Sequence, residues 1–181
     1  MQPVSSQSQP ANPKLAYFFD LIDRLSDTLG TSIPPLVNID QLRSLPPGTL
    51  GRAWADSLDQ HHLQPFTTGS RRKQIHDGIH VLTGYGTDPI GEAEVQAFLL
   101  GAKFHLANAL LGLGLLRPLR QQLQHSHLSR EQVRLRLRQA YQRGYHSQFD
   151  VDSWQPELMW SLPLSQVQSL VGIQPDCSPK S

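Results

Sequence analysis

Residues 75–92 read IHDGIHVLTGYGTDPIGE and predict a helix, a tight turn and a second helix. The first helix should stop at TGYG, because Gly84 or Gly86 can adopt the positive φ that ends a helix. Asp88 and Pro89 predict the next start, since Asp accepts free backbone N–H groups and Pro at the first helical position loses no hydrogen bond. The chain is therefore expected to fold back on itself here.

Apolar residues at three- and four-residue spacing predict further amphipathic helices on both sides of this turn. The expected helical segments are Lys14–Leu29, a short turn at Asp40–Ser44, Thr49–Leu63, Ser70–Leu82, a long helix from Asp88 with the body Ala97–Leu116, Leu128–Gly144 and Pro163–Ile173. Ser129 and Gln132 have capping-box spacing at the start of the helix Leu128–Gly144, and Gly144 is expected to end that helix. Because no segment alternates with the period of a strand, the predicted class is all-α, one compact domain of about six or seven helices around a long buried helix.

The totals limit the chemistry that the chain can carry. Its 181 residues have a formal net charge of +1 and suit one domain, expected at residues 14–173 between flexible tails at 1–13 and 174–181. Cys177 is the only cysteine, so any metal must be held by histidines and carboxylates. Residues 1–13 contain no charge and no apolar run, which argues against a secretory signal and predicts a cytoplasmic protein.

The segment Ala97–Leu116 is about as long as a membrane span, but polar groups interrupt its centre. Lys103, His105 and Asn108 would be costly in a bilayer, which favours a buried helix. Its leucines and glycines fit either an ordinary core or an apolar channel for a lipid chain, with Phe104 and Leu111 as candidate lining residues.

His76 and His80 are four residues apart, a spacing that lets two imidazoles on a helix converge on one ion. Alone, such a pair also arises by chance on a helix surface. The predicted turn brings Glu92 near this helix, whereas Glu94 lies about 200° further round and is the poorer candidate. Two histidines and one carboxylate resemble the ligand sets of catalytic metals. Asp77 faces about 100° away from His76 and could be a fourth ligand, an orienting partner of a histidine or a proton carrier.

A zinc peptidase is a weak alternative. Its H-E-x-x-H motif needs a glutamate that reaches a metal-bound water, and Asp77 is one methylene shorter.

Basic residues suggest surfaces for anionic ligands. Arg130, Arg134 and Arg138 form one helical stripe that could lie on lipid headgroups, hold a phosphate or simply be solvated. Nucleic-acid binding is not expected, because the total charge is nearly neutral and no binding motif accompanies the stripe. Three consecutive basic residues precede the histidines and could meet a phosphate or carboxylate there: Arg71, Arg72 and Lys73.

The pattern H-D-x-x-H followed after eleven residues by E, formed by His76, Asp77, His80 and Glu92, resembles the signature of the ubiquinone biosynthesis family known as coenzyme Q biosynthesis protein four. The blocks PGTLGRAW, RRKQIHDGIHVLTGYGTDPIGEAEVQAF and AYQRGYHSQFDVDSW also look like that family's blocks in their usual order. The resemblance covers roughly residues 14–173.

The resemblance implies a helical protein at the inner face of a membrane that binds a polyprenyl lipid or prenylated quinone precursor. It implies a divalent metal held by His76, Asp77, His80 and Glu92, zinc in the first place, with iron or magnesium as alternatives, and Asp77 as the candidate catalytic residue. The implied reaction is removal of the C1 carboxyl group, with hydroxylation, from a polyprenyl 4-hydroxybenzoate. Other quinone biosynthesis proteins and a second copy of the chain are the expected partners.

Two other functions remain open. The chain could be a non-catalytic lipid-binding scaffold for a quinone biosynthesis complex, with the metal fixing the helix–turn–helix. It could also be a metallohydrolase acting on a phosphorylated prenyl lipid.

Overall fold

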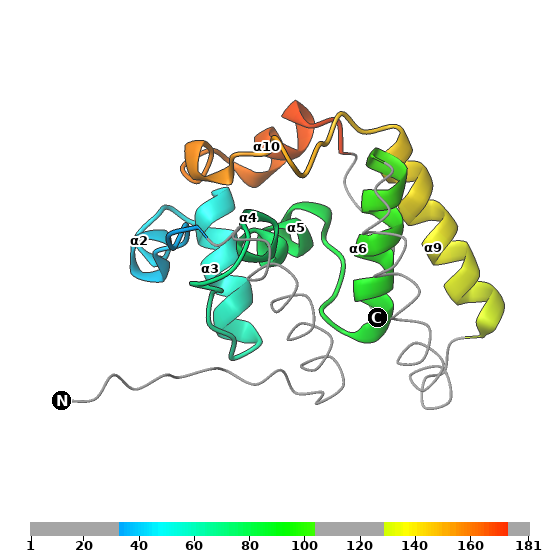
Figure 1. Ribbon diagram of the computed structural model, residues 1–181, viewed down its shortest axis with the longest axis horizontal. Coiled ribbons are helices and arrows are strands. Elements are labelled where there is room, and N and C mark those ends of the chain that lie inside the picture. Colours follow the sequence, from blue (N-terminus) through cyan, green and yellow to red (C-terminus); the bar gives the residue numbers. More distant parts are fainter. Residues whose placement is uncertain (1–32, 104–128, 174–181) are drawn as a thin grey trace.

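The computed structural model describes residues 33–103 and 129–173, and within these ranges the fold is all-α, as predicted (Figure 1). It contains α2 (Ile39–Arg43), α3 (Leu50–Gln60), α4 (Arg71–Gln74), α5 (His76–Thr83), α6 (Pro89–Ala102), α9 (Arg130–Tyr145), the 3-10 helix η1 (Pro156–Leu158) and α10 (Leu164–Leu170). The only β-type pairing in the described ranges is an isolated bridge between Thr49 and Pro163.

Side-chain caps start the principal helices at the positions that the sequence indicates. The Thr49 hydroxyl accepts a hydrogen bond from the Arg52 backbone N–H at the start of α3. Ser129 and Gln132 form the expected capping box at the start of α9.

Several helix limits differ from the predictions, and α3 and α10 each end three residues before the expected limits at Leu63 and Ile173. The single helix expected at Ser70–Leu82 is divided at Ile75 into α4 and α5. The long helix expected to continue to Leu116 ends at Ala102; the next residue, Lys103, has an extended backbone, and its Nζ lies 2.7 Å from Asp150 Oδ2. Gly144 does not end α9, which continues to Tyr145.

Gly144 serves close packing between α6 and α9, which lie side by side in Figure 1. A Cβ added at Gly144 would overlap the carbonyl oxygen of Phe98, and one added at Gly101 would overlap that of Tyr141. The two glycines therefore let the backbones of the helices touch.

The main core joins α3, α5 and α6 to the C-terminal segment. Trp54, Leu82 and Phe98 are fully buried in it. The ring of Phe149 connects Phe98 with Trp154, at centroid distances of 5.7 and 5.4 Å. A smaller cluster of Ile90, Ala93, Val133 and Leu137 fills the space between α6 and α9.

The segment that follows α9 returns to α3 and α5. The first two N–H groups of α3, on Leu50 and Gly51, have no acceptor within the helix and donate instead to the carbonyls of Leu162 and Trp160, each at 2.9 Å. The Gln168 side chain of α10 donates to the Leu82 carbonyl of α5, also at 2.9 Å. These contacts fix the helix that carries both histidines against the rest of the core.

Several predictions fall outside the described residues: the helix Lys14–Leu29, the two tails and the segment from Phe104 onward that includes Leu111. Among the helices that the structure does describe, none is long and apolar enough to cross a membrane.

Candidate metal centre

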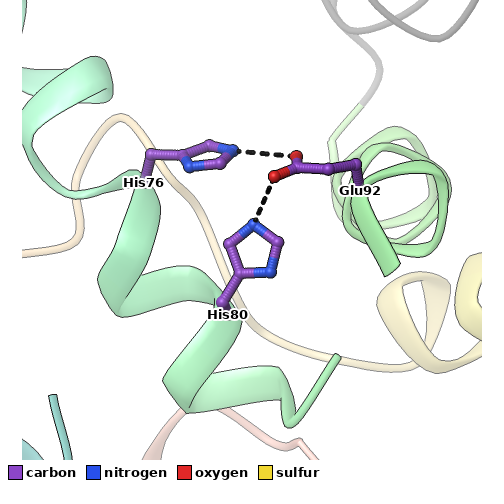
Figure 2. Close-up of side chains that lie close together, drawn as sticks. All are labelled: His76, His80 and Glu92. Carbon is purple, nitrogen blue, oxygen red and sulfur yellow. Dashed lines mark ion pairs between the residues drawn. The ribbon is translucent and has the colours of Figure 1, made fainter. Parts of the chain in front are cut away.

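His76, His80 and Glu92 converge where α5 faces the first turn of α6 (Figure 2). His76 Nε2 lies 3.3 Å from Glu92 Oε2, and His80 Nε2 lies 3.3 Å from Glu92 Oε1. The two imidazole centroids are 4.7 Å apart. One potential ligand atom from each residue lies within 4.8 Å of the others, so the three side chains could hold one metal ion.

The turn between α5 and α6 creates this arrangement. Gly84 ends α5 with a left-handed backbone, φ 79°, which confirms one of the two glycines that the sequence offered. The Asp88 side chain then accepts from the backbone N–H groups of Ile90 and Gly91 and starts α6. A Cβ at Gly91 would overlap the Gly86 carbonyl, so a glycine is needed where the new helix passes its own entry loop.

Gly78 allows α5 to pack closely against the core, and the need for a glycine at this position was not evident from the sequence. Gly78 lies between the two histidines along the chain and faces the indole of Trp54, which a Cβ would overlap. This contact holds the helix flat on α3, while His76 and His80 project toward α6.

The site is almost closed to solvent and strongly charged. His80 and Glu92 are 4% and 5% exposed. Burial would lower the pKa of His76, but the negative charge of Glu92, followed by Asp77, outweighs burial and raises that pKa to about 10. Burial would raise the pKa of the Glu92 carboxyl, but the positive charge of His76 outweighs it and holds that pKa below its usual range.

A backbone carbonyl orients His80. Nδ1 of His80 lies 3.3 Å from the carbonyl oxygen of Tyr85 and donates to it, which leaves Nε2 as the nitrogen that faces Glu92. Nε2 is buried, makes no hydrogen bond and faces the Glu92 carboxylate. A proton on Nε2 or a metal ion could each join this nitrogen to the carboxylate, and two imidazoles with one carboxylate are a donor set that fits a metal ion.

Asp77 lies on the outer side of His76. Its Oδ1 is 3.7 Å from His76 Nδ1, whereas the opposite nitrogen of that ring faces Glu92. This position is that of a carboxylate that orients a ligating histidine, one of the three roles left open by the sequence. Direct ligation by Asp77 and a catalytic role for it stay predictions.

Glu94, ranked below Glu92 by the sequence, points to α9. Its two carboxylate oxygens accept from Arg136 Nε and Nη2, each at 2.7 Å. The carboxylate is therefore engaged by a bidentate ion pair on the other face of α6.

The three basic residues before the histidines contact other parts of the described chain. Arg71 pairs with Glu157 at 2.7 Å, and Arg72 lies 3.3 Å from Asp152. Lys73 Nζ lies 4.8 Å from the centre of the Phe66 ring. A role for these residues in binding substrate stays a prediction, as does lipid binding by Phe104 and Leu111, which lie outside the described ranges.

Known proteins resemble this chain over most of its length. The family described as Coenzyme Q (ubiquinone) biosynthesis protein Coq4 matches residues 34–176. A mitochondrial ubiquinone biosynthesis protein COQ4 homolog from Mus musculus is 27% identical over 156 residues, which cover 77% of this chain and 55% of the mouse protein. The mitochondrial ubiquinone biosynthesis protein coq-4 of Neurospora crassa is 35% identical over 89 residues, 41% of this chain and 24% of that protein. The chain thus aligns with about half or less of these relatives.

A solved structure shares the fold. The crystal structure of a candidate ubiquinone biosynthesis protein from Nostoc punctiforme superposes with a TM-score of 0.63 at 19% identity and covers 88% of this chain and 85% of that one.

Proposed function

The chain belongs to the Coq4 family of coenzyme Q (ubiquinone) biosynthesis proteins, and from this premise we propose that His76, His80 and Glu92 bind a divalent metal at which a prenylated aromatic acid is processed. The observation that carries the proposal is the convergence of two imidazole nitrogens on the buried Glu92 carboxylate, each 3.3 Å from one of its oxygens. Zinc fits the two imidazoles and one carboxylate best, and iron would suit the same donors.

The reaction that we propose is C1 decarboxylation, with hydroxylation, of a polyprenyl 4-hydroxybenzoate. The bond between C1 and the carboxyl carbon breaks and releases CO₂, and C1 gains a hydroxyl group whose oxygen comes from dioxygen. The second oxygen atom leaves as water, with two electrons from an external reductant. A bound zinc or iron ion would supply a Lewis acid for the phenolate and carboxylate oxygens of the ring. Glu92 turns one carboxylate oxygen toward each imidazole, at 3.3 Å in both cases, and so keeps both imidazoles at one point. The Tyr85 carbonyl keeps a His80 proton on Nδ1, and the negative charge of Asp77, 3.7 Å from His76 Nδ1, favours a proton on that nitrogen. Burial of His80 and Glu92 limits contact with water and strengthens the charge interactions between the three side chains.

A non-catalytic scaffold is the second candidate. The three side chains come from two helices and are nearly buried, so a metal there would also fasten α5 to α6. Under this proposal the protein binds prenyl lipid and other quinone biosynthesis proteins without turning over substrate. We extend both proposals to a homodimer at the inner face of a membrane, in a single domain at residues 14–173.

Elemental analysis of the purified full chain, with mass spectrometry of its organic extract, tests metal and lipid binding together. We expect about one zinc or iron ion per chain and a prenyl compound in the extract. His80→Ala should lose the metal while keeping its helical circular dichroism. A metal content equal to that of wild type in His80→Ala would overturn the proposed site.

Turnover separates the two candidates. Protein loaded in turn with zinc, iron or magnesium is mixed with polyprenyl 4-hydroxybenzoate, oxygen and a two-electron reductant such as ascorbate, and released CO₂ is measured. CO₂ from wild type but not from His80→Ala supports the enzyme. No CO₂ under any metal, with lipid still bound, supports the scaffold.

A further inference from the structure

Arg143, near the end of α9, contacts both sides of the turn that ends the histidine-bearing helix. Its Nη1 donates to the carbonyl oxygen of Thr83 at 2.7 Å. Its guanidinium carbon lies over the Tyr85 ring, 5.2 Å from the centroid. The residue between these two contacts is Gly84, whose left-handed backbone directs the chain out of α5.

The same turn orients a candidate metal ligand. The carbonyl oxygen of Tyr85 is the acceptor for His80 Nδ1 at 3.3 Å. A backbone carbonyl can direct an imidazole only if its own peptide plane is held, and Thr83 and Tyr85 are the two residues through which Arg143 holds this turn.

We propose that Arg143 is a positioning residue of the metal centre, which acts through the turn at Thr83–Tyr85 to aim the Tyr85 carbonyl at His80 Nδ1. The proton then stays on Nδ1, and Nε2 is presented to the metal beside Glu92. This inference rests on the proposed metal site and adds a residue of α9, which supplies none of its ligands.

Arginine suits this role better than lysine. A planar guanidinium donates to a carbonyl and stacks on an aromatic ring at the same time, whereas an ammonium group is a single point charge on a flexible stem. Arg143→Lys therefore keeps the positive charge and a hydrogen-bond donor, but it cannot donate to the Thr83 carbonyl and stack on the Tyr85 ring at the same time.

Arg136 provides a matched control on the same helix. It pairs with Glu94 on the face of α6 away from the site and has no contact in common with His80 among those described. Arg136→Lys should disturb the packing of α6 on α9 about as much as Arg143→Lys does, without reaching the Tyr85 carbonyl.

The experiment measures zinc affinity of the full chain by competition with a chromophoric chelator, together with thermal unfolding of the metal-free protein. We expect Arg143→Lys to bind zinc about 10- to 100-fold more weakly than wild type, the range for partners that orient a ligand. Arg136→Lys should bind zinc within about twofold of wild type, because surface changes away from the site rarely alter it. Equal zinc affinity in wild type and Arg143→Lys, or an equal loss in both variants, would overturn the inference.

Nitrogen NMR of the imidazoles in metal-free protein gives a second readout. Wild type and Arg136→Lys should show His80 with its proton on Nδ1, and Arg143→Lys should show a mixture of tautomers. An unchanged His80 tautomer in Arg143→Lys would overturn the inference. Failure of wild-type protein to bind either zinc or iron would instead overturn the proposed function, while the tautomer measurement still tests Arg143.

Discussion

Glu92 contacts two imidazoles with its two carboxylate oxygens, so the protonation of one small cluster decides how strongly it attracts a metal ion. In the metal-free protein burial lowers the pKa of His76, but the negative charge of Glu92 outweighs burial and raises that pKa to about 10. His76 therefore carries a proton at neutral pH, and a metal must displace it.

Metal affinity should consequently rise with pH. Each displaced proton contributes about a tenfold gain in affinity per pH unit below the pKa of its group. Zinc titration at several values between about pH 6 and 8 should show this slope, and calorimetry in buffers of different ionisation enthalpy should detect the released proton. Equal affinity at all these pH values would contradict the raised pKa of His76.

Replacement of Asp77 distinguishes its roles. If Asp77 orients His76, then Asp77→Asn, whose amide oxygen still accepts from Nδ1, should weaken zinc binding by about tenfold or less, and Asp77→Ala by more. His80→Ala, which removes a ligand, serves as the reference for complete loss. Loss of zinc from Asp77→Asn as severe as from His80→Ala would identify Asp77 as a ligand instead.

At the scale of elements, the pairing of α6 with α9 depends on contact between backbones. Gly144→Ala should lower the free energy of unfolding by about 3 kcal/mol, because the new methyl group overlaps the Phe98 carbonyl. Gln142→Ala, on the exposed side of the same helix, should change it by less than about 0.5 kcal/mol. Chemical denaturation measures both, and a Gly144→Ala variant as stable as Gln142→Ala would contradict the described packing.

Helix starts were predictable from the sequence because caps are local. Thr49, Asp88 and Ser129 each bond to backbone within three residues of themselves. Helix ends were less predictable. Lys103, which follows the last residue of α6, pairs with Asp150, and Gly144 packs against Phe98 instead of ending α9, so both contacts join residues that are distant in the chain.

In the candidate site, too, local features were predictable from the sequence and long-range contacts were not. Spacing placed His76 and His80 on one face, and the turn residues added Glu92. The acceptor of His80 could not be predicted, because the Tyr85 carbonyl is a backbone group and any residue type supplies one. The hydrogen bond from Arg143 of α9 to the Thr83 carbonyl at the end of α5 also could not be predicted, because the two residues are distant in the chain and no local sequence pattern links them.

At the scale of the whole molecule, α9 presents an exposed basic and aromatic face away from α6. Arg130, Arg134 and Arg138 are exposed, and the rings of Tyr141 and Tyr145, 42% and 66% exposed, stack at 6.5 Å. Arginine and tyrosine together suit the headgroup region of an anionic bilayer.

This face should bind anionic vesicles if the protein associates with a membrane surface. Each arginine contributes about 1 kcal/mol near such a surface, so replacing all three by glutamine should weaken binding by about 100-fold. Sedimentation with vesicles that contain phosphatidylserine measures the effect, and neutral vesicles and high salt are the controls. Undiminished binding by the triple variant would assign membrane contact to another surface.

The N–H groups that begin α3 find their acceptors at Trp160 and Leu162, near the other end of the described chain. During synthesis, a ribosome completes α3 long before it produces those acceptors, so the nascent helix begins with donors that only water satisfies. The core can therefore form completely only after the last segment has emerged. The contacts that complete the core join residues far apart in the chain, and such contacts make folding slower than in a bundle of neighbouring helical hairpins. A nonsense codon before Trp160 would leave a product whose histidine-bearing helix lacks its outer support, a substrate for proteolysis rather than a smaller working protein.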